Sequence, residues 1–195
     1  MTAPETMSAV VLAGGRSRRM GTDKALLACG GRNFLETILQ ALSAFPDVMI
    51  SSAGTERYKG AGARIVADIY RQAGPVGGIY SSLVASEREY LFVTACDTPF
   101  LSASLIGGIC RASEGYRCCV AREENGRVHS LCGVYHKSMI PIFKDQIEGG
   151  RYKIALAYDK VMIKYFELSP RQAAELRNFN TEEEYMELMN SSASS

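Results

Sequence analysis

The 195-residue chain has no tryptophan, only two histidines and no long uninterrupted apolar run. Without a segment of about 20 apolar residues, no membrane-spanning helix is expected, and residues 1–7 lack the charged start and apolar middle of a signal peptide. Lysine and arginine exceed aspartate and glutamate by one, so bulk charge gives no reason to expect nucleic acid or a membrane surface as a partner. We therefore expect a protein of the cytoplasm.

The cysteines also lack the spacing of a metal site. The six cysteines form no C-x-x-C pair, and no ligand cluster lies beside His129 or His136. A chain of this length can bury a sizeable core without a disulfide or a metal. We therefore expect ordinary reduced thiols.

One stretch near the N-terminus, residues 12–24 (LAGGRSRRMGTDK), concentrates glycine and positive charge. Glycine lets backbone N–H groups approach anionic oxygens, and arginine and lysine neutralise phosphate charge. Gly14 and Gly15 are adjacent, so the dinucleotide fingerprint GxGxxG does not fit, and the spacing also fails for a Walker A loop. The segment predicts a polyphosphate-binding loop, with a glycine turn bearing solvated cations as the structural alternative.

Short apolar runs alternate with helical patterns along the chain. This alternation predicts an α/β protein with a three-layer, doubly wound, mostly parallel sheet. We expect one domain over residues 1–190 and a disordered tail over 191–195. The expected strands are 10–13, 48–50, 64–67, 90–95, 118–121, 131–135 and 161–166. The expected helices begin at Asn33, Pro75, Ser102, Ser138 and Thr181, and capping boxes are predicted at the first and last of these.

Two candidate site segments follow predicted strands. The glycine loop follows the strand over 10–13, and Asp97 follows the almost continuously apolar strand over 90–95. Open α/β sheets bind ligands beyond the carboxyl ends of their strands, so both segments should lie at one edge. A carboxylate there can hold Mg²⁺ together with phosphate oxygens and water, although an aspartate in this position can also be a helix cap or a loop residue.

The motifs together resemble the nucleotidyltransferase superfamily, most closely the molybdenum cofactor guanylyltransferases. The resemblance is carried by five segments in order: 12–24, 74–79 (GPVGGI), 96–101 (CDTPFL), 133–135 (GVY) and 178–181 (NFNT), with Asp68 between the first two. It spans nearly the whole chain and implies the Rossmann-like nucleotidyltransferase fold.

The resemblance implies roles for individual residues. Asp97 would bind Mg²⁺, Lys24 would offset charge on the transferring phosphoryl group, and Arg19 would hold the pyrophosphate. The other assigned residues either contact the nucleotide (Leu12, Ala13, Gly14, Gly15, Asp68) or lie near the acceptor (Gly77, Gly78, Asn180). An aspartate after a strand and an asparagine before a helix cap also have structural explanations, so Asp68 and Asn180 keep both interpretations.

The implied reaction is transfer of GMP from GTP to molybdopterin or the molybdenum cofactor, giving the dinucleotide cofactor and pyrophosphate. Cofactor-biosynthesis proteins and molybdoenzymes are the implied partners. The alternatives are a cytidylyltransferase for the same cofactor, a transferase for another phosphorylated acceptor, and a non-catalytic nucleotide-binding accessory protein. Ser51-Ser52 stands where the family often supplies an asparagine, and His129-Ser130 replaces the usual His-Pro or Gln-Pro, so the specificity for nucleotide and acceptor stays open.

Overall fold

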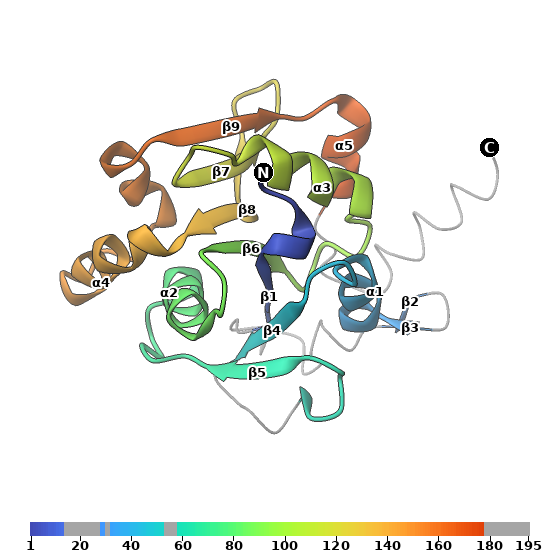
Figure 1. Ribbon diagram of the computed structural model, residues 1–195, viewed down its shortest axis with the longest axis horizontal. Helices are drawn as coiled ribbons and strands as arrows, with labels where there is room; N and C mark the ends of the chain where they lie inside the picture. The colour runs from blue at the N-terminus through green and yellow to red at the C-terminus, as the bar shows by residue number, and fades with distance from the viewer. Residues whose placement is uncertain (14–27, 30–31, 53–57, 178–195) are drawn as a thin grey trace.

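The computed structural model describes residues 1–13, 28–29, 32–52 and 58–177. Its main feature is a seven-stranded sheet with the strand order β5-β4-β1-β6-β8-β7-β9 (Figure 1). In sequence order these strands are β1 (Ser8–Leu12), β4 (Asp47–Ser52), β5 (Arg64–Ala67), β6 (Tyr90–Ala95), β7 (Cys118–Arg122), β8 (Val128–His136) and β9 (Ile163–Glu167). A small antiparallel pair is formed by β2 (Ala28–Cys29) and β3 (Arg32–Asn33).

The sheet is mostly parallel, as predicted. Strand β1 pairs in parallel with β4 and β6, β4 with β5, and β7 with β9. Strand β8 runs antiparallel to both of its neighbours, β6 and β7. Every residue of β1 is buried, and Val10 is in register with Met49 on one side and Val93 on the other. A continuous apolar sequence is what a strand covered on both faces requires.

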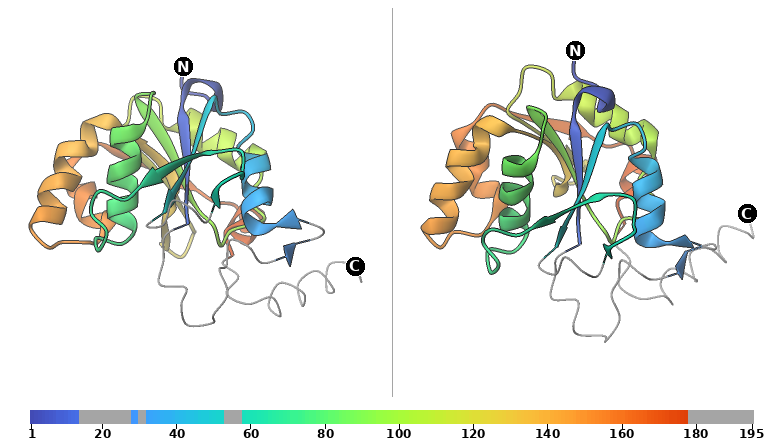
Figure 2. Two further views of the ribbon diagram at one scale, coloured as in Figure 1. Left: turned by 90° about the horizontal axis from the view of Figure 1, so that it is seen from below. Right: turned by 60° about the horizontal axis from the view of Figure 1, so that its bottom comes forward.

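Helices cover both faces of the sheet, which confirms the three-layer, doubly wound architecture (Figure 2). Helices α1 (Phe34–Ala41), α3 (Ala103–Ala112) and α5 (Pro170–Glu175) lie on one face, and α2 (Pro75–Ala85) and α4 (Ile140–Glu148) lie on the other. Leu35 and Ile109 share one core cluster with Phe92 of β6. Ile79 and Phe143 share the other cluster with Val93, the next residue of the same strand.

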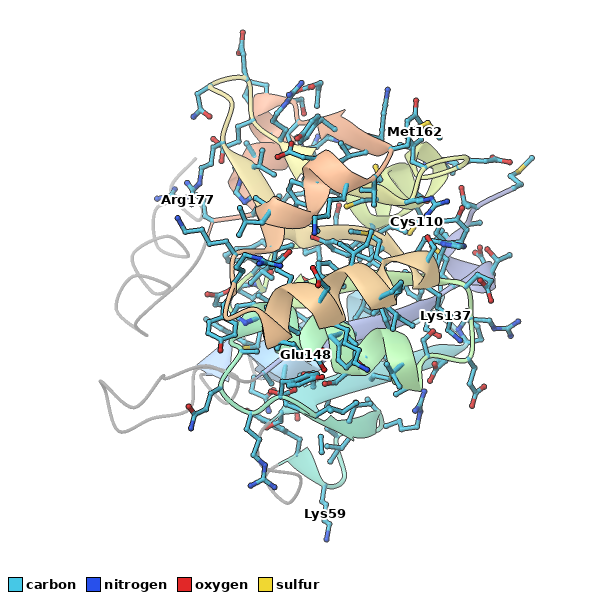
Figure 3. The ribbon with its side chains drawn as sticks, turned by 90° about the vertical axis from the view of Figure 1, so that its left-hand side faces the viewer. Lys59, Cys110, Lys137, Glu148, Met162 and Arg177 are labelled. Carbon is cyan, nitrogen blue, oxygen red and sulfur yellow. The ribbon has the colours of Figure 1, made fainter. Side chains whose placement is uncertain are left out.

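Helix α4 is also tied to the loop between β5 and α2. Figure 3 looks onto the face of the molecule that carries α4, with Glu148 labelled at the end of this helix. The Tyr70 hydroxyl donates a hydrogen bond of 2.8 Å to Oε1 of Glu148, and the Tyr70 ring packs edge-on against Tyr80 of α2, with 5.3 Å between the ring centroids. The loop that leads into α2 therefore has a support on each of the two helices of this face.

Two of the predicted helix starts are confirmed by their caps. Asn33 Oδ1 accepts a hydrogen bond of 2.8 Å from the Glu36 amide, and Glu36 Oε2 accepts one of 2.9 Å from the Asn33 amide. Ser102 Oγ accepts a bond of 3.2 Å from the Leu105 amide at the start of α3. These side chains satisfy N–H groups that have no partner within the helix.

The prediction that Ser138 caps the next helix is wrong. Residues Lys137–Met139 form a 3₁₀ turn, η5, and α4 begins only at Ile140. The ring atom Nδ1 of His136 lies 3.1 Å from the Ser138 amide and accepts its hydrogen bond. The imidazole therefore caps the 3₁₀ turn, and α4 itself begins without a side-chain cap. Other 3₁₀ segments are η1 (Pro4–Thr6), which precedes β1, and η6 (Ile154–Lys160), which links α4 to β9.

The remaining predicted strands differ from the structure mainly in length, but the pair of β2 and β3 and helix α5 were not predicted. Strand β8 starts three residues before the expected 131, because residues 128–129 pair with the end of β7 across a turn that contains Gly126 at φ 86°. The helix expected from Thr181, the tail over 191–195 and the domain limit at 190 lie outside the described residues. None of the helices that the structure describes has the length and apolar character needed to cross a membrane.

Five cysteines in the described part of the chain are free thiols, as expected. Cys96 is partly exposed, and the other four are buried in the cores on the two faces of the sheet. Burial raises the pKa of Cys110 and of Cys119 to about 12, and it also raises the pKa of Cys118 and Cys132. These four thiols therefore stay protonated and unreactive at neutral pH while the fold is closed.

Candidate active site

The candidate site lies where the four strands β1, β4, β5 and β6 end, which we call the carboxyl edge. The chain passes from β1 outward through β4 to β5 and then returns to β6 on the other side of β1. The direction of strand order therefore reverses between β1 and β6, which is where open α/β sheets bind ligands. The carboxyl edge faces downward in both views of Figure 2.

Backbone hydrogen bonds continue past the strand ends and bring the predicted segments together. The Ala13 amide donates to the Ser51 carbonyl over 2.9 Å, and the Cys96 amide donates to the Leu12 carbonyl over 3.3 Å. Asp97 follows directly, so it leaves the sheet on the strand next to the one that leads into the glycine loop. This confirms that the start of that loop and Asp97 share one edge. Gly14, Gly15, Arg19 and Lys24 lie outside the described residues, as does Asn180.

A buried serine orients the predicted nucleotide residue Asp68. Ser51 Oγ donates a hydrogen bond of 2.7 Å to Asp68 Oδ1, and Ser51 is only 2% exposed whereas Asp68 is partly exposed. A Cβ atom on Gly78 would lie 2.8 Å from Ser51 Oγ and 3.1 Å from Leu12 Cδ2. Three residues named from the sequence, Leu12, Asp68 and Gly78, therefore meet around a fourth, Ser51, which the sequence marked only as a departure from the family.

The glycine segment at the start of α2 has a tight backbone. Gly74 takes φ 61° and ψ −148°, which side-chain-bearing residues rarely adopt, and Pro75 opens the helix. A Cβ atom on Gly77 would lie 2.8 Å from the Tyr70 carbonyl oxygen, so close backbone packing already explains this glycine. Ser81 Oγ accepts from the Ile69 amide at 2.9 Å and donates to the Gly77 carbonyl at 2.8 Å. These bonds fix the start of α2 against the loop that carries Asp68.

The loop that carries Asp97 is held by its own hydrogen bonds. Thr98 Oγ1 donates to the Ala95 carbonyl over 3.1 Å, and the Leu101 amide donates to the Thr98 carbonyl over 3.4 Å. The Ser102 amide donates to Oε2 of Glu175 over 3.0 Å. Asp97 itself is partly exposed at the carboxyl edge.

The donor set at this edge fits Mg²⁺ better than a metal that needs a protein cage. Across the described ranges, no group of three or more histidine, cysteine, aspartate or glutamate side chains is arranged to hold a metal ion. Mg²⁺ commonly binds through one or two carboxylates together with substrate phosphates and water. Asp97 offers such a carboxylate, whereas Asp68 follows β5, which β4 and β1 separate from the strand that carries Asp97.

Beyond β6, on the same side of the sheet as the carboxyl edge, the pairing of β7 with β8 contains an irregularity that the sequence did not reveal. Pairing between β7 and β8 jumps from Val120–Gly133 to Ala121–His129, which leaves residues 130–132 as extra residues in β8. The hydroxyl of the buried Tyr135 donates to the Ser130 carbonyl over 2.6 Å and supports this bulge. Bulges of this kind often occur next to active sites because they redirect side chains.

His129 is engaged in a local pair at this bulge. Its Nε2 lies 2.6 Å from Oε1 of Glu123, and this hydrogen bond lowers the pKa of Glu123. His129 is therefore held by the hairpin between β7 and β8.

Two further contacts at the edge were not predicted from any pattern in the sequence. The Tyr58 hydroxyl donates a hydrogen bond of 3.3 Å to the Ala13 carbonyl, and Glu175 contacts Ser102.

Comparison with known proteins identifies the family. Residues 9–161 match the model of the MobA-like NTP transferase domain. The chain belongs to this family. The matched range contains all of β1 but its first residue, together with the glycine loop, α2 and the Asp97 loop, so the family assignment and the carboxyl-edge site concern the same part of the chain.

Individual relatives agree with the family assignment. The chain is 31% identical over 190 residues to the "Probable molybdenum cofactor guanylyltransferase" of Clostridium perfringens (strain 13 / Type A), and the match covers 93% of this chain and 96% of the relative. The structure of molybdopterin-guanine dinucleotide biosynthesis protein A from Archaeoglobus fulgidus is similar with a TM-score of 0.81 at 20% identity, over 95% of this chain and 100% of that one.

A second family of transferases shares the fold. The 2-C-methyl-D-erythritol 4-phosphate cytidylyltransferase from Thermus thermophilus is similar with a TM-score of 0.69 at 17% identity, over 91% of this chain and 94% of that one. At these sequence identities, the two solved structures are evidence for a shared fold and not for a shared substrate. Membership of the MobA-like family makes the chain an enzyme of the nucleotidyltransferase class.

Proposed function

We propose that this protein transfers GMP from GTP to molybdopterin or to the molybdenum cofactor, producing the guanine dinucleotide form and pyrophosphate. The observation that carries the proposal is the match to guanylyltransferases over 93% of the chain, combined with the convergence of Ala13, Asp68 and Asp97 at the carboxyl edge. The names of the relatives indicate guanylyl transfer to the molybdenum cofactor, and the carboxyl edge is the part of an open α/β sheet where ligands bind.

The nucleotide would lie against β1, β4 and β5. Asp68, oriented by Ser51, would accept hydrogen bonds from the nucleoside, and Leu12 would supply an apolar contact beside it. Gly14 and Gly15 would contribute backbone amides to the phosphates, with Lys24 and Arg19 neutralising their charge. The acceptor would approach from the start of α2, near Gly77 and Gly78, and from Asn180 of the C-terminal segment.

Enzymes of this class generally use a divalent metal, and we propose Mg²⁺ held by Asp97. When bound, the ion lowers the cost of charge that develops on the phosphates. The residues of the chain contribute mainly by positioning: Asp97 is fixed by the loop bonds of Thr98, and Lys24 is assigned to the transferring phosphoryl group.

The chemistry requires no general base. An oxygen of the acceptor's phosphate forms a bond to the α-phosphorus of GTP, the bond between that phosphorus and the β-phosphate bridging oxygen breaks, and pyrophosphate leaves with the electron pair. A phosphate monoester is already anionic near neutral pH, so no proton has to be removed. The local pairing of His129 with Glu123 agrees with a site that needs no free imidazole.

The working setting would be the cytoplasm, where GTP and Mg²⁺ are available. The product would pass to cofactor-biosynthesis proteins or to molybdoenzymes. We also propose that residues 1–190 form one domain, because the described elements from β1 to α5 belong to a single layered structure.

The test is a parallel measurement of binding and turnover with GTP, CTP and ATP. We expect calorimetry to show a preference for GTP that strengthens with Mg²⁺, and pyrophosphate release only when GTP and molybdopterin are both present. Lys24→Ala should lower turnover by about 10² to 10³ because it removes a positive charge from the developing negative charge. A preference for CTP would change the product, and GTP binding without pyrophosphate release would contradict the enzymatic proposal.

A further inference from the structure

The N-terminus of α3 is capped by two residues that are far apart in sequence. Ser102 Oγ accepts from the Leu105 amide, but the acceptor for the Ser102 amide comes from Glu175, 73 residues away. In a local capping box the third residue of the helix supplies this acceptor, and Leu105 has no acceptor in its side chain. The capping box of α3 is therefore completed by α5.

The other two boxes in the described α-helices are local. Asn33 and Glu36 complete the box of α1, and Ser169 and Gln172 complete that of α5. Each pair is three residues apart. The start of α3 thus differs from these in depending on the position of a separate helix, which lies beside α3 on the same face of the sheet (Figure 1).

Ser102 is also the end of the loop that carries Asp97. At the start of this loop, Thr98 bonds to the carbonyl of Ala95, the last residue of β6. Its middle is closed by the bond from the Leu101 amide to the Thr98 carbonyl, with Leu101 only 3% exposed. Glu175 holds the other end, so residues 97–102 are fixed to the sheet at one side and to α5 at the other.

The anchor at α5 is itself firm. Leu176, the residue after Glu175, is 2% exposed and packs in the same core cluster as Leu101 and Leu105. Glu175 is partly buried, and a carboxylate near a helix N-terminus is favoured by the unpaired amides there. These contacts hold the carboxylate in place while it accepts from Ser102.

We propose that Glu175 is a positioning residue that orients the Asp97 carboxylate for its divalent cation through Ser102 and the loop between them. This inference rests on the proposed function, because it uses Asp97 as the ligand. It also assigns a role to α5, which lies beyond the range matched by the family model.

The test combines metal binding with hydrogen exchange on the full chain. Mn²⁺ binding in the presence of GTP is followed by electron paramagnetic resonance, and exchange is measured for peptides covering residues 97–102. We expect Glu175→Ala to weaken Mn²⁺ binding by about tenfold, as is typical when an outer partner of a metal ligand is removed, and to speed exchange in this loop. GTP affinity without metal should be unchanged, since Asp68 and Ser51 lie on other strands.

Three matched variants separate positioning from general stability. Glu175→Gln keeps an acceptor oxygen at the same reach and should retain Mn²⁺ binding close to that of the unchanged protein. Glu175→Asp has a side chain shorter by one methylene and should bind Mn²⁺ more weakly. This variant tests the proposal even if Glu175→Ala does not fold. Glu167→Ala removes a carboxylate at the end of β9 that pairs with Arg122, and it should leave both measurements unchanged.

Each result has a defined meaning. Unchanged exchange and unchanged Mn²⁺ binding in Glu175→Ala and Glu175→Asp would overturn the proposal. Faster exchange with normal Mn²⁺ binding would make Glu175 a helix cap only and would also overturn it. If the unchanged protein with GTP binds no Mn²⁺, the proposed function fails at its metal site and this inference fails with it, a case recognisable without any variant.

Discussion

Ser51 donates the hydrogen of its hydroxyl group to Oδ1 of Asp68 across neighbouring strands, over 2.7 Å. This bond fixes the orientation of the Asp68 carboxylate through one of its two oxygens. The space for the pair exists because Gly78 has no side chain, since a Cβ atom there would lie 2.8 Å from the serine oxygen. Given the nucleotide-binding role proposed for Asp68, the affinity for GTP should depend on this serine.

Ser51→Ala should weaken GTP binding by roughly tenfold, because a hydrogen bond to a charged group typically contributes about 1.5–3 kcal/mol and part of it is replaced by water. Calorimetric titration of GTP checks this expectation. Ser82→Ala is the matched control, since Ser82 is equally buried but its hydroxyl bonds to the Gly78 carbonyl within its own helix. Equal GTP affinity in Ser51→Ala and the unchanged protein would remove Asp68 from nucleotide binding.

Gly78→Ala should both destabilise the fold and weaken GTP binding. The added methyl group would press on Ser51 and on Leu12, and overpacking of this kind typically costs about 1–3 kcal/mol. Urea unfolding measures the first effect and calorimetry the second. In Gly107→Ala, the control in α3, the nearest atom is the flexible end of Arg111, so that variant should be neutral or more stable.

Asp97→Asn should lower turnover by about 10² to 10³ while the protein remains folded, because a neutral amide is a poorer ligand for a hard divalent cation. The loss should be accompanied by weaker dependence on added Mg²⁺. Steady-state rates across a Mg²⁺ series test this, with Asp159→Asn, an exposed aspartate of η6, as the control. Turnover near that of the control would mean that Asp97 is not the metal ligand.

The opposite edge of the sheet should control stability in acid. Asp47 accepts hydrogen bonds from Ser8 at 2.6 Å and from Arg64 at 2.9 Å. Burial acts to raise the pKa of Asp47, but these bonds and the Arg64 charge together hold it below its usual value of 3.8. A carboxyl group whose pKa falls on folding stabilises the native state above the unfolded value, and that stability is lost as pH drops through the folded value.

Urea midpoints measured between pH 7 and pH 3 test this. We expect Asp47→Asn to be less stable than the unchanged protein at pH 7 and to lose less stability on acidification below about pH 4. Asp159→Asn should have the same urea midpoints as the unchanged protein at pH 7 and at pH 3. Parallel pH curves for all three proteins would show that the Asp47 cluster does not contribute.

Much of the fold was predictable from local chemistry, although α5 was missed despite its local capping box. The apolar run at β6, the capping box at Asn33 and the proline entry to α2 each specify their element without distant partners, and the structure has them at the expected positions. The prediction for Ser138 was wrong because its own amide bonds to the His136 ring at the start of a 3₁₀ turn. Residue 141, three positions after Ser138, is a proline and has no N–H for a serine cap to bind.

The candidate site was predictable in its strand ends but not in its supports. Asp97 and Asp68 each follow an apolar strand, and that position marked them. Ser51, Tyr58 and Glu175 act through contacts with residues 17, 45 and 73 positions away, and no local spacing rule connects those positions. Residues that hold a site together across the fold become visible only once the chain is folded.

The four buried thiols can report how often the structure around them opens to solvent. Cys118 and Cys119 of β7 and Cys132 of β8 lie in the half of the sheet away from β1, β4 and β5, and Cys110 of α3 packs in the core against that half. A thiol-directed dye reacts only with thiolates that reach solvent, so its rate of attachment reports how often this half of the sheet opens locally. Counting the attached dyes by mass spectrometry would then show whether GTP, which we propose binds at β1, β4 and β5, slows opening across the whole sheet or only on its own side.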